Sequence, residues 1–410
     1  MLGGGPDQGL DWPRAVELAL AHHPDLEEAR QALESKAHDR RAAFGGFLPS
    51  ADGSFTRRRS RTAGTAPTGD AMSLGVDATQ PLFTGFGTTG AYLEAVRAWD
   101  AQEAAYRQTS AEVRLRLRLS FTELLRLEEA LEVNRRIADR RRENADLIAL
   151  RYDAGREHRG SKLRAQAIAD QAAFNVRATE RAIESQSFAL GRELGGRFWM
   201  PLRAAGRLEE MVPEPPEPVP DYAALAARTP EVEQRLRTAE AVQARVLSAR
   251  AAFWPEAEGT FSYGYSGNRA SALRDDASLL LTVTMPFFRG GRNVEGYLAA
   301  DADYRAAIED ARSARDAAVS GLASAWTAFK DAREFLEVRR AFLDASRERA
   351  DIVHSQYTSG LADFQDFDIA EQELADAEGA YVRALADAMT AEAQWHRAVG
   401  ATMEEAADDR

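Results

Sequence analysis

The chain repeats itself at an offset of about 205 residues, which is half of its length of 410 residues. Glycines, prolines and aromatic residues of the first half have counterparts in the second half. The matched pairs include Pro49 with Pro255, Phe55 with Phe261, Pro81 with Pro286, Phe83 with Phe288, Gly85 with Gly290, Tyr152 with Tyr357, Gly155 with Gly360 and Gly195 with Gly400. Because glycine and proline set backbone geometry, matched positions indicate matched turns. The sequence therefore predicts a tandem duplication.

A proline-rich segment separates the two halves. Its prolines alternate with glutamates, which predicts an extended linker; they are Pro213, Pro215, Pro216, Pro218 and Pro220. We expect a first repeat over residues 1–205, a linker over 206–221 and a second repeat over 222–410. The two repeats should form one protomer, because neither half can bury its helices alone.

Long proline-free stretches predict long helices in both repeats. An interior proline costs a helix about 3 kcal/mol, and there is none between Pro81 and Pro201 or after Pro286. Both stretches are rich in Ala, Leu, Glu, Arg and Gln, which favour helix. Each repeat is therefore expected to run helix, strand, strand, very long helix, turn, helix. The expected helices are 14–46, 87–150 and 161–194 in the first repeat, with 290–355 as the long helix of the second.

Apolar residues recur every seven positions along the long helices, which predicts packing against another helix. They are Leu117, Leu124, Leu131 and Ala138 in the first repeat, and Leu322, Phe329, Leu336 and Leu343 in the second. The stripe is narrow and Arg and Glu fill the other faces, so we expect helices paired side by side rather than around a thick core. Residues 113–119 alternate as a strand would, but residues 318–324 do not, so helix is expected for both.

Four short segments have the pattern of half-buried strands, at about 54–62, 73–80, 258–266 and 278–285. Each is close to the roughly 9–11 residues of a strand that spans a bilayer, and most carry apolar residues on one side only. The first is the exception and carries Arg57, Arg58, Arg59 and Arg61. Since an arginine facing lipid costs about 2–4 kcal/mol at the midplane, these should lie in a lumen or at headgroup level.

Four strands cannot close a barrel, and open strand edges are not tolerated in lipid. Three chains would supply twelve strands, an even number within the range of membrane barrels. The sequence thus predicts a mainly α-helical protein with laterally paired long helices, whose strands close a twelve-stranded membrane β-barrel in a homotrimer. The alternative is a soluble or peripheral coiled-coil scaffold of the cell envelope that carries two surface hairpins.

Composition excludes several classes of protein. The net charge of −13 disfavours binding to nucleic acid, and the absence of cysteine removes disulfides, thiolate catalysis and cysteine metal sites. The six histidines show no metal-ligand spacing, and no nucleophile elbow is present, so neither an enzyme nor a cofactor is expected. The first residues lack the basic and apolar regions of a signal peptide, so the chain is expected to be cytosolic or to have lost a leader.

The chain resembles the TolC family of outer-membrane efflux proteins from about Leu10 to Gly400. The motifs that carry the resemblance are residues 23–26 (HPDL), 47–49 (FLP), 80–86 (QPLFTGF), 151–155 (RYDAG) and 356–361 (QYTSGL). The resemblance implies a trimer with its barrel in the outer membrane and a helical tunnel across the periplasm. Such a duct works with a periplasmic membrane-fusion adaptor and an inner-membrane RND or ABC transporter, and does no chemistry itself.

The resemblance also implies roles for the two helical turns near residues 155 and 360. They would form the periplasmic tip that binds the adaptor, through Tyr152, Gly155, Arg156, Tyr357, Gly360 and Leu361. A gate is implied at Ser161, Tyr357, Asp363, Asp366 and Asp368, where a trimer would present a ring of carboxylates at the tunnel mouth. Plain turn geometry for the glycines, and a helix N-terminal charge for Asp366, are the simpler alternatives.

Pro81 and Gly85 in the first repeat, and Pro286 and Gly290 in the second, mark the expected joint between strand and long helix. Residues 85–90 also fit the dinucleotide-binding pattern G-x-G-x-x-G. The following helix is several times too long for such a site, and the second repeat loses the pattern. The glycines are therefore interpreted as a flexible joint.

Overall fold

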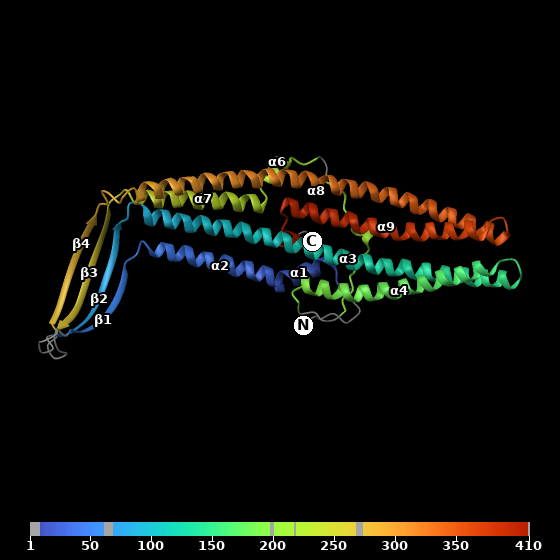
Figure 1. The fold of residues 1–410 in the computed structure, drawn as a ribbon, viewed down its shortest axis with the longest axis horizontal. Coiled ribbons are helices and arrows are strands. Elements are labelled where there is room, and N and C mark those ends of the chain that lie inside the picture. Colours follow the sequence, from blue (N-terminus) through green and yellow to red (C-terminus); the bar gives the residue numbers. More distant parts are fainter. Residues whose placement is uncertain (1–8, 61–68, 197–200, 217–218, 268–273, 409–410) are drawn as a thin grey trace. The chain divides into compact units, whose positions relative to one another are not determined.

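A computed structural model describes residues 9–60, 69–196, 201–216, 219–267 and 274–408. In chain order the elements are α1 (Trp12–His22), α2 (Pro24–Gly45), β1 (Ser50–Ser60), β2 (Gly69–Phe83), α3 (Gly87–Asp153), α4 (Arg159–Glu193), α5 (Leu208–Met211), α6 (Tyr222–Ala226), α7 (Pro230–Ala251), β3 (Glu256–Gly267), β4 (Arg274–Thr284), α8 (Arg292–Ser359), α9 (Phe364–Val399) and α10 (Met403–Asp408). Helix, strand, strand, very long helix and helix follow one another in both repeats (Figure 1), so the predicted duplication is confirmed.

The chain forms two compact units that do not coincide with the two repeats. The helical unit contains residues 1–29, 106–230 and 316–410, and the sheet unit contains residues 30–105 and 231–315. Each unit takes segments from both repeats, so the repeats are interleaved in space. The repeat boundaries themselves stay a prediction.

The first expected helix, 14–46, is divided into α1 and α2 at His23. Helix α1 begins where the Asp11 side chain accepts a hydrogen bond from the Arg14 backbone N–H at 2.9 Å, with Pro13 in the first turn. It ends at His23, which has an extended backbone because Pro24 follows and disfavours the helical conformation. The prediction of one continuous helix was therefore wrong at this residue.

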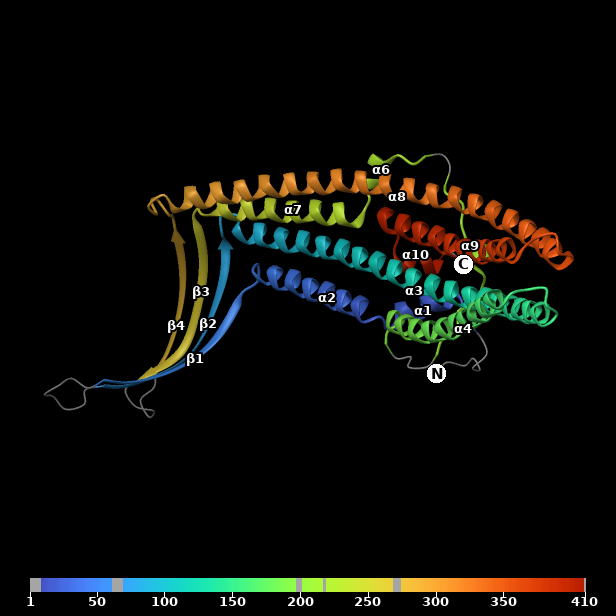
Figure 2. The ribbon, with the colours of Figure 1, turned by 45° about the vertical axis from the view of Figure 1, so that its right-hand side comes forward.

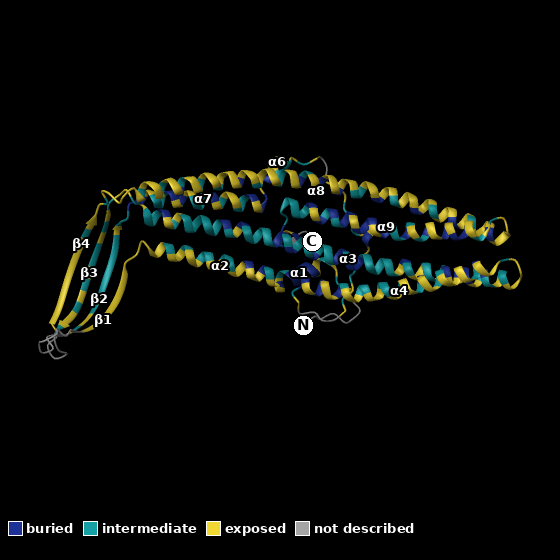
Figure 3. Cartoon of the chain, in the orientation of Figure 1, coloured by how far each residue is buried: buried dark blue, intermediate teal, exposed yellow. Residues whose placement is uncertain are grey.

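The heptad stripe of the long helices is buried over most of its length, whereas Leu131 and Ala138 are half-buried. In the helical unit Leu117, Leu124, Leu322, Phe329 and Leu336 are at most 5% exposed. Residues 113–119 are helical within α3, so the alternating pattern there did not make a strand. Figure 3 shows that exposed and half-buried residues cover most of α3 and α8 outside this stripe. The core is accordingly a set of narrow helix contacts.

The inter-repeat linker is not wholly extended, which corrects the prediction for residues 206–221. Helix α5 interrupts it, and the Leu208 backbone N–H donates to the Glu129 carboxylate of α3 at 2.7 Å. Just before it, Ala204 forms a parallel bridge with Leu10. Pro218 lies outside the described residues. The chain is thus held within the helical unit at Ala204, just before the linker, and at Leu208 inside it.

The four strands lie in the sheet unit as one antiparallel sheet in the order β1-β2-β3-β4 (Figure 2). Directly paired residues share a face, so the register defines two faces. One face is apolar and carries Phe55, Leu74, Val76, Phe261, Tyr263, Leu279, Leu281 and Val283. The other is mainly polar and carries Asp52, Ser54, Asp77, Thr79, Glu258, Thr260, Ser262 and Thr282, with Leu280 as an apolar exception.

The arginines of β1 are divided between the two faces. Arg58 pairs with Ala71 and shares the polar face, whereas Arg57 pairs with Met72 and shares the apolar face near the end of the sheet. The side chains of Arg59 and Arg61 lie outside the described residues. The apolar face is therefore free of arginine over its middle, as the sequence analysis required.

Within the described ranges, none of the helices carries an apolar stretch of the length needed to cross a membrane.

Candidate gate and docking turns

Two turns reverse the chain in the helical unit: residues 154–158 join α3 to α4, and residues 360–363 join α8 to α9. We call them the first and second tip turns. Both turns close by the same kind of backbone hydrogen bond. In the first, the Arg156 N–H donates to the Arg151 carbonyl at 2.8 Å; in the second, the Leu361 N–H donates to the Gln356 carbonyl, also at 2.8 Å. This is the Schellman arrangement, which requires a left-handed residue just before the donor.

Glycine supplies that left-handed residue in both turns. Gly155 has φ +68° and Gly360 has φ +81°, values that a side chain would strain. The sequence prediction that glycine permits the chain reversal is consistent with this geometry. Leu361 follows at 82% exposure, and Arg156 occupies the matching exposed position in the first turn.

Tyr357 connects the two tip turns. Its ring stacks on Phe367 of α9 with centroids 4.7 Å apart, and the Arg151 guanidinium of α3 lies over the ring at 4.4 Å. Its hydroxyl donates to the Glu157 carboxylate at 3.0 Å, and its backbone carbonyl accepts from Arg151 at 2.7 Å. Tyr357 is 1% exposed, so its side chain lies behind the surface of the tip turns. It ties α8 and α9 to the first tip turn.

Burial and the Glu157 carboxylate together raise the pKa of Tyr357 to about 12, so the hydroxyl remains a donor at all ordinary pH values. Burial alone would raise the pKa of Glu157, but hydrogen bonds from the His158 backbone and from Ser161 and Tyr357 lower it. The contact between Tyr357 and Glu157 is therefore a hydrogen bond to a charged acceptor, which is the stronger kind.

The three predicted gate aspartates have different environments. Asp363 caps the N-terminus of α9, where its carboxylate accepts from the Asp366 backbone N–H at 2.9 Å. Asp366 is exposed in the first turn of α9, which is also the favoured position for a helix N-terminal charge. Asp368 is only 8% exposed. Exposed carboxylates in this region are thus Asp363 and Asp366.

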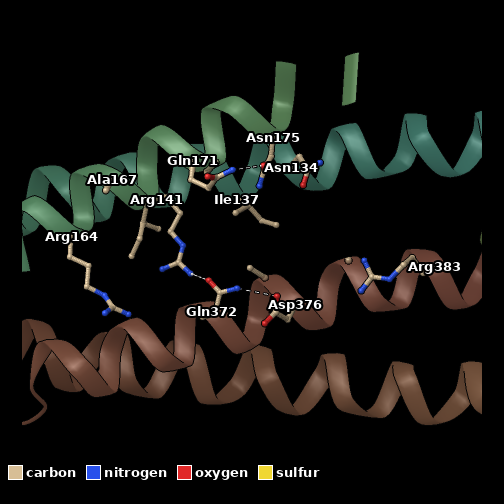
Figure 4. A pocket seen from close by; sticks show the side chains of 14 residues that line it. Asn134, Ile137, Arg141, Arg164, Ala167, Gln171, Asn175, Gln372, Asp376 and Arg383 are labelled. Atoms are coloured by element: carbon tan, nitrogen blue, oxygen red, sulfur yellow. Dashed lines mark hydrogen bonds between the residues drawn. The ribbon is translucent and has the colours of Figure 1, made fainter. Parts of the chain in front are cut away.

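Asp368, one of the carboxylates predicted for the ring at the tunnel mouth, is paired with one arginine from α3 and one from α4. Arg164 of α4 lies 2.8 Å from one carboxylate oxygen and Arg141 of α3 lies 3.4 Å from the other. Arg141 also donates to Gln372 at 3.1 Å, and Figure 4 shows both arginines reaching from α3 and α4 toward α9. Asp368 therefore holds α9 against the first helix pair.

A cavity of about 550 Å³ lies beside this contact, between α3, α4 and α9. Amide and guanidinium groups line about half of it, including Asn134, Gln171, Asn175 and Arg383 (Figure 4), and isoleucine, alanine and glycine line most of the rest. Gln372 donates to Asp376 at its edge at 3.0 Å. Within the described residues, no group of three or more His, Asp or Glu side chains is placed to hold a metal ion.

Sequence reasoning missed Arg141, Arg164 and Glu157, although one local signal was present. Asn134, Arg141 and Ile148 are seven residues apart and Arg141 and Ile148 are buried, so a charged side chain interrupts an inward-facing stripe. A buried arginine needs a carboxylate, but the partner lies 227 residues away in the chain. No spacing rule for a single sequence connects them.

The joints between strand and long helix differ between the two repeats. Gly85, at φ +59°, has no room for a side chain, since a Cβ there would lie 2.6 Å from the Cβ of Trp254. Gly90 similarly allows α3 to approach Ser248 of α7. Gly290, at φ +62°, has open space around it. Close packing therefore explains the first set of glycines, and β2 continues through Pro81 with a register shift after it.

Comparison with known proteins agrees with this architecture. Over 144 residues the chain is 33% identical to Outer membrane protein OprJ of Pseudomonas aeruginosa. The matched region covers 33% of this chain and 29% of that protein, so it spans less than a third of the relative's length. The fold resembles that of the outer membrane protein VceC of Vibrio cholerae, with TM-score 0.81, 20% identity, and coverage of 95% of this chain and 96% of that one.

The open state of the MtrE outer membrane channel of Neisseria gonorrhoeae is similar as well, with TM-score 0.86 at 19% identity over 96% of this chain and 89% of that one. At these identities the structures establish the fold, and they confirm the predicted fold class. A family model described as "Outer membrane efflux protein" matches residues 15–196 and 222–401, which is most of both repeats. The chain therefore belongs to the outer membrane efflux protein family.

Proposed function

We propose that the protein is a passive exit duct in the cell outer membrane, serving a tripartite efflux pump or a type I secretion system. It would act as a homotrimer that extends into the periplasm and receives substrates through a periplasmic membrane-fusion adaptor. An inner-membrane RND or ABC transporter would provide the energy. The supporting facts are the family membership and the two faces of the sheet.

The two-faced sheet is the observation that carries the proposal. Its apolar face is exposed within the chain: Leu279 is 83% and Leu281 64% exposed. Thr282, the next residue of β4, lies on the polar face. Burying that apolar surface in lipid would be favourable by roughly 25 cal/mol per Å². The polar face, with Asp77 and Ser262, would then line water.

The edges of the sheet support a closed ring of copies. Strands β1 and β4 each have one neighbour among the described residues, and in lipid every unpaired backbone group costs several kcal/mol. All neighbours in the sheet are antiparallel, so β4 of one copy would run antiparallel to β1 of the next. Three copies would close a twelve-stranded antiparallel barrel, which removes the edges.

The tip turns are the proposed contact with the adaptor. Leu361, Arg156, Gly155 and Gly360 are exposed there, and Tyr152 is half-buried beside Lys162. Tyr357 and Asp368 would lie behind this surface and hold α8 and α9 against α3 and α4 in the closed state. Opening the duct would then require breaking the contact of Tyr357 with Glu157 and the contact of Asp368 with the buried Arg141. Asp363 and Asp366 remain the candidates for a carboxylate ring at the mouth.

Extraction and size analysis test the proposal. The protein should need detergent for extraction from membranes, migrate as a trimer, and conduct ions when reconstituted in a planar bilayer. The Asp366→Asn variant should change cation block of that current at low salt, because it removes three charges from the mouth. A monodisperse monomer in buffer without detergent would refute the duct and favour the scaffold alternative.

A further inference from the structure

The two tip turns differ in the residue that caps the following helix. His158 and Asp363 occupy the same position in the two repeats, 205 residues apart, and each is the N-cap of its helix. Asp363 accepts the Asp366 backbone N–H with a carboxylate oxygen at 2.9 Å. His158 accepts the Ser161 backbone N–H with imidazole Nδ1 at 3.2 Å. One duplicated structure thus uses two chemically different acceptors.

The surroundings of His158 fit the imidazole ring. Gly160 leaves the space that the ring fills, since a Cβ at residue 160 would lie 3.2 Å from Nδ1. In the second repeat, where the cap is the smaller aspartate, the equivalent residue is Gln365. Ser161, which is 1% exposed, places its hydroxyl 3.2 Å from Nε2 of the same ring. The imidazole is therefore seated over the first turn of α4.

Only a neutral imidazole can make this cap. Nδ1 accepts a hydrogen bond through its lone pair, and a protonated imidazole has a donor at both nitrogens. Histidine is also the side chain whose charge ordinarily changes near physiological pH. A positive charge at a helix N-terminus opposes the helix dipole, whereas the carboxylate of Asp363 is favoured there.

We propose that His158 makes the first tip turn responsive to protons: protonation of its imidazole releases the cap of α4, while the second tip turn keeps its cap. The inference deepens the proposed function, because it assigns a regulation to the tip that would bind the adaptor.

The charged groups around His158 indicate which contacts protonation of its imidazole would weaken. Glu157 lies 4.0 Å from Nε2 and is the acceptor of the Tyr357 hydroxyl, so a charged imidazole would compete for that carboxylate. From α4, Arg159 is adjacent in sequence, and Lys162 is paired with Asp153 of α3 at 3.2 Å. Loosening the first turn of α4 would thus reach the contact between Tyr357 and the first tip turn.

Hydrogen–deuterium exchange on the purified full-length protein tests the proposal. Backbone amides of residues 159–163 should lose about fivefold in protection between pH 7.5 and pH 5.5, after correction for the intrinsic pH dependence of exchange. Residues 364–368, behind Asp363, are the internal control and should keep their protection. The His158→Asn variant replaces the Nδ1 acceptor with an amide oxygen that does not titrate, and should abolish the change at residues 159–163.

Equal pH dependence in the two tip turns, or a change that persists in His158→Asn, would overturn the proposal. Gly160→Ala is a second variant. Its added methyl group would crowd the imidazole ring, and should lower the protection of residues 159–163 at pH 7.5 toward the wild-type value at pH 5.5.

Adaptor affinity measured at both pH values then tests the link to function. An affinity that is pH-dependent in the wild type and flat in His158→Asn supports the link, and equal dependence in both refutes it. Because exchange is measured without an adaptor, its outcome is independent of whether the duct function is correct.

Discussion

At the scale of single residues, Tyr357 combines three interactions that have different origins. Its ring packs between Phe367 and Arg151, and its hydroxyl binds the ionised Glu157. The first two depend on the ring and the third only on the hydroxyl. A substitution that removes the hydroxyl alone therefore separates the hydrogen bond from the packing.

We expect Tyr357→Phe to lower the free energy of unfolding of the helical unit by about 1.5–3 kcal/mol, because a hydrogen bond to a charged acceptor is lost. Since the pKa of Glu157 is lowered, its contribution is fully present above the ordinary glutamate pKa and disappears as the pH falls through the folded value. The difference between variant and wild type should therefore shrink in acid. Denaturant melts at pH 7 and pH 3 measure it, with Tyr152→Phe as the matched change in the first repeat.

Asp368 provides the second prediction at this scale. The Asp368→Asn variant leaves Arg141, which is 6% exposed, buried without a full counter-charge. We expect a loss of about 3 kcal/mol in the free energy of unfolding, the size typical of breaking one side of a buried ion pair. Arg164 contributes little to this loss because its side chain is 67% exposed. Asp366→Asn is the control and should leave the free energy of unfolding nearly unchanged. Equal losses of stability in both variants would contradict the conclusion that Asp368 holds α9 against α3 and α4.

At the scale of elements, the linker segment around α5 is held by two neighbouring carboxylates of α3. Glu129 accepts the Leu208 backbone N–H, and Glu128 accepts that of Ala204. Burial raises the pKa of Glu128 to about 7, with Glu132 adding to the effect and the Ala204 bond and Arg203 opposing it. One oxygen of Glu128 has no hydrogen-bond partner in the structure and is available to hold the proton.

A raised carboxyl pKa means that the folded protein holds the proton more tightly than the unfolded chain does. The resulting stabilisation is complete below the ordinary glutamate pKa and is lost as the pH rises through about 7. We expect amide protection of residues 202–208 to be higher at pH 6 than at pH 8. Glu128→Gln should remove that difference, while Glu129→Gln should weaken protection at both pH values.

The sequence predicted the order and nature of the main elements because each has a local cause. Proline-free stretches, heptad leucines and the alternation in the strands all act within a few turns of chain. The break between α1 and α2 at His23 also has a local cause, because Pro24 follows it, although one continuous helix was predicted there. The contacts of Asp368 and Glu157 join residues more than 190 positions apart. These depend on how the repeats pack, which propensity and spacing do not encode.

At the scale of the whole molecule, the two repeats perform unequal tasks with one architecture. Tyr357 is buried and hydrogen-bonded, whereas its counterpart Tyr152 is half-buried beside Lys162. Asp363 caps α9 with a carboxylate, whereas His158 caps α4 with an imidazole. The two turns thus have the same backbone hydrogen bonds but different side chains. Tyr357, at the end of α8, donates the hydrogen bond that links the turns, and Glu157 of the first tip turn accepts it.

The proposed lipid-facing side of the sheet leads to a prediction for the assembled protein. Leu281 and Thr282 are adjacent in β4 but lie on opposite faces, paired with Gly259 and Glu258 respectively. A lysine at residue 281 would face lipid and cost about 2–4 kcal/mol if it lies near the midplane. A lysine at residue 282 would face water beside Glu258, where opposite charges across strands are favourable.

We therefore expect Leu281→Lys to reduce the yield of trimer inserted in liposomes by at least tenfold, and Thr282→Lys to insert like the wild type. The comparison controls for the added charge and for the position along the strand, because both variants introduce a lysine at neighbouring residues that lie on opposite faces. Heat resistance of the trimer on gels and the number of conducting units per liposome provide two independent readouts. Equal insertion of both variants would show that the apolar face does not contact lipid, and the scaffold alternative would then be the better account of the exposed leucines.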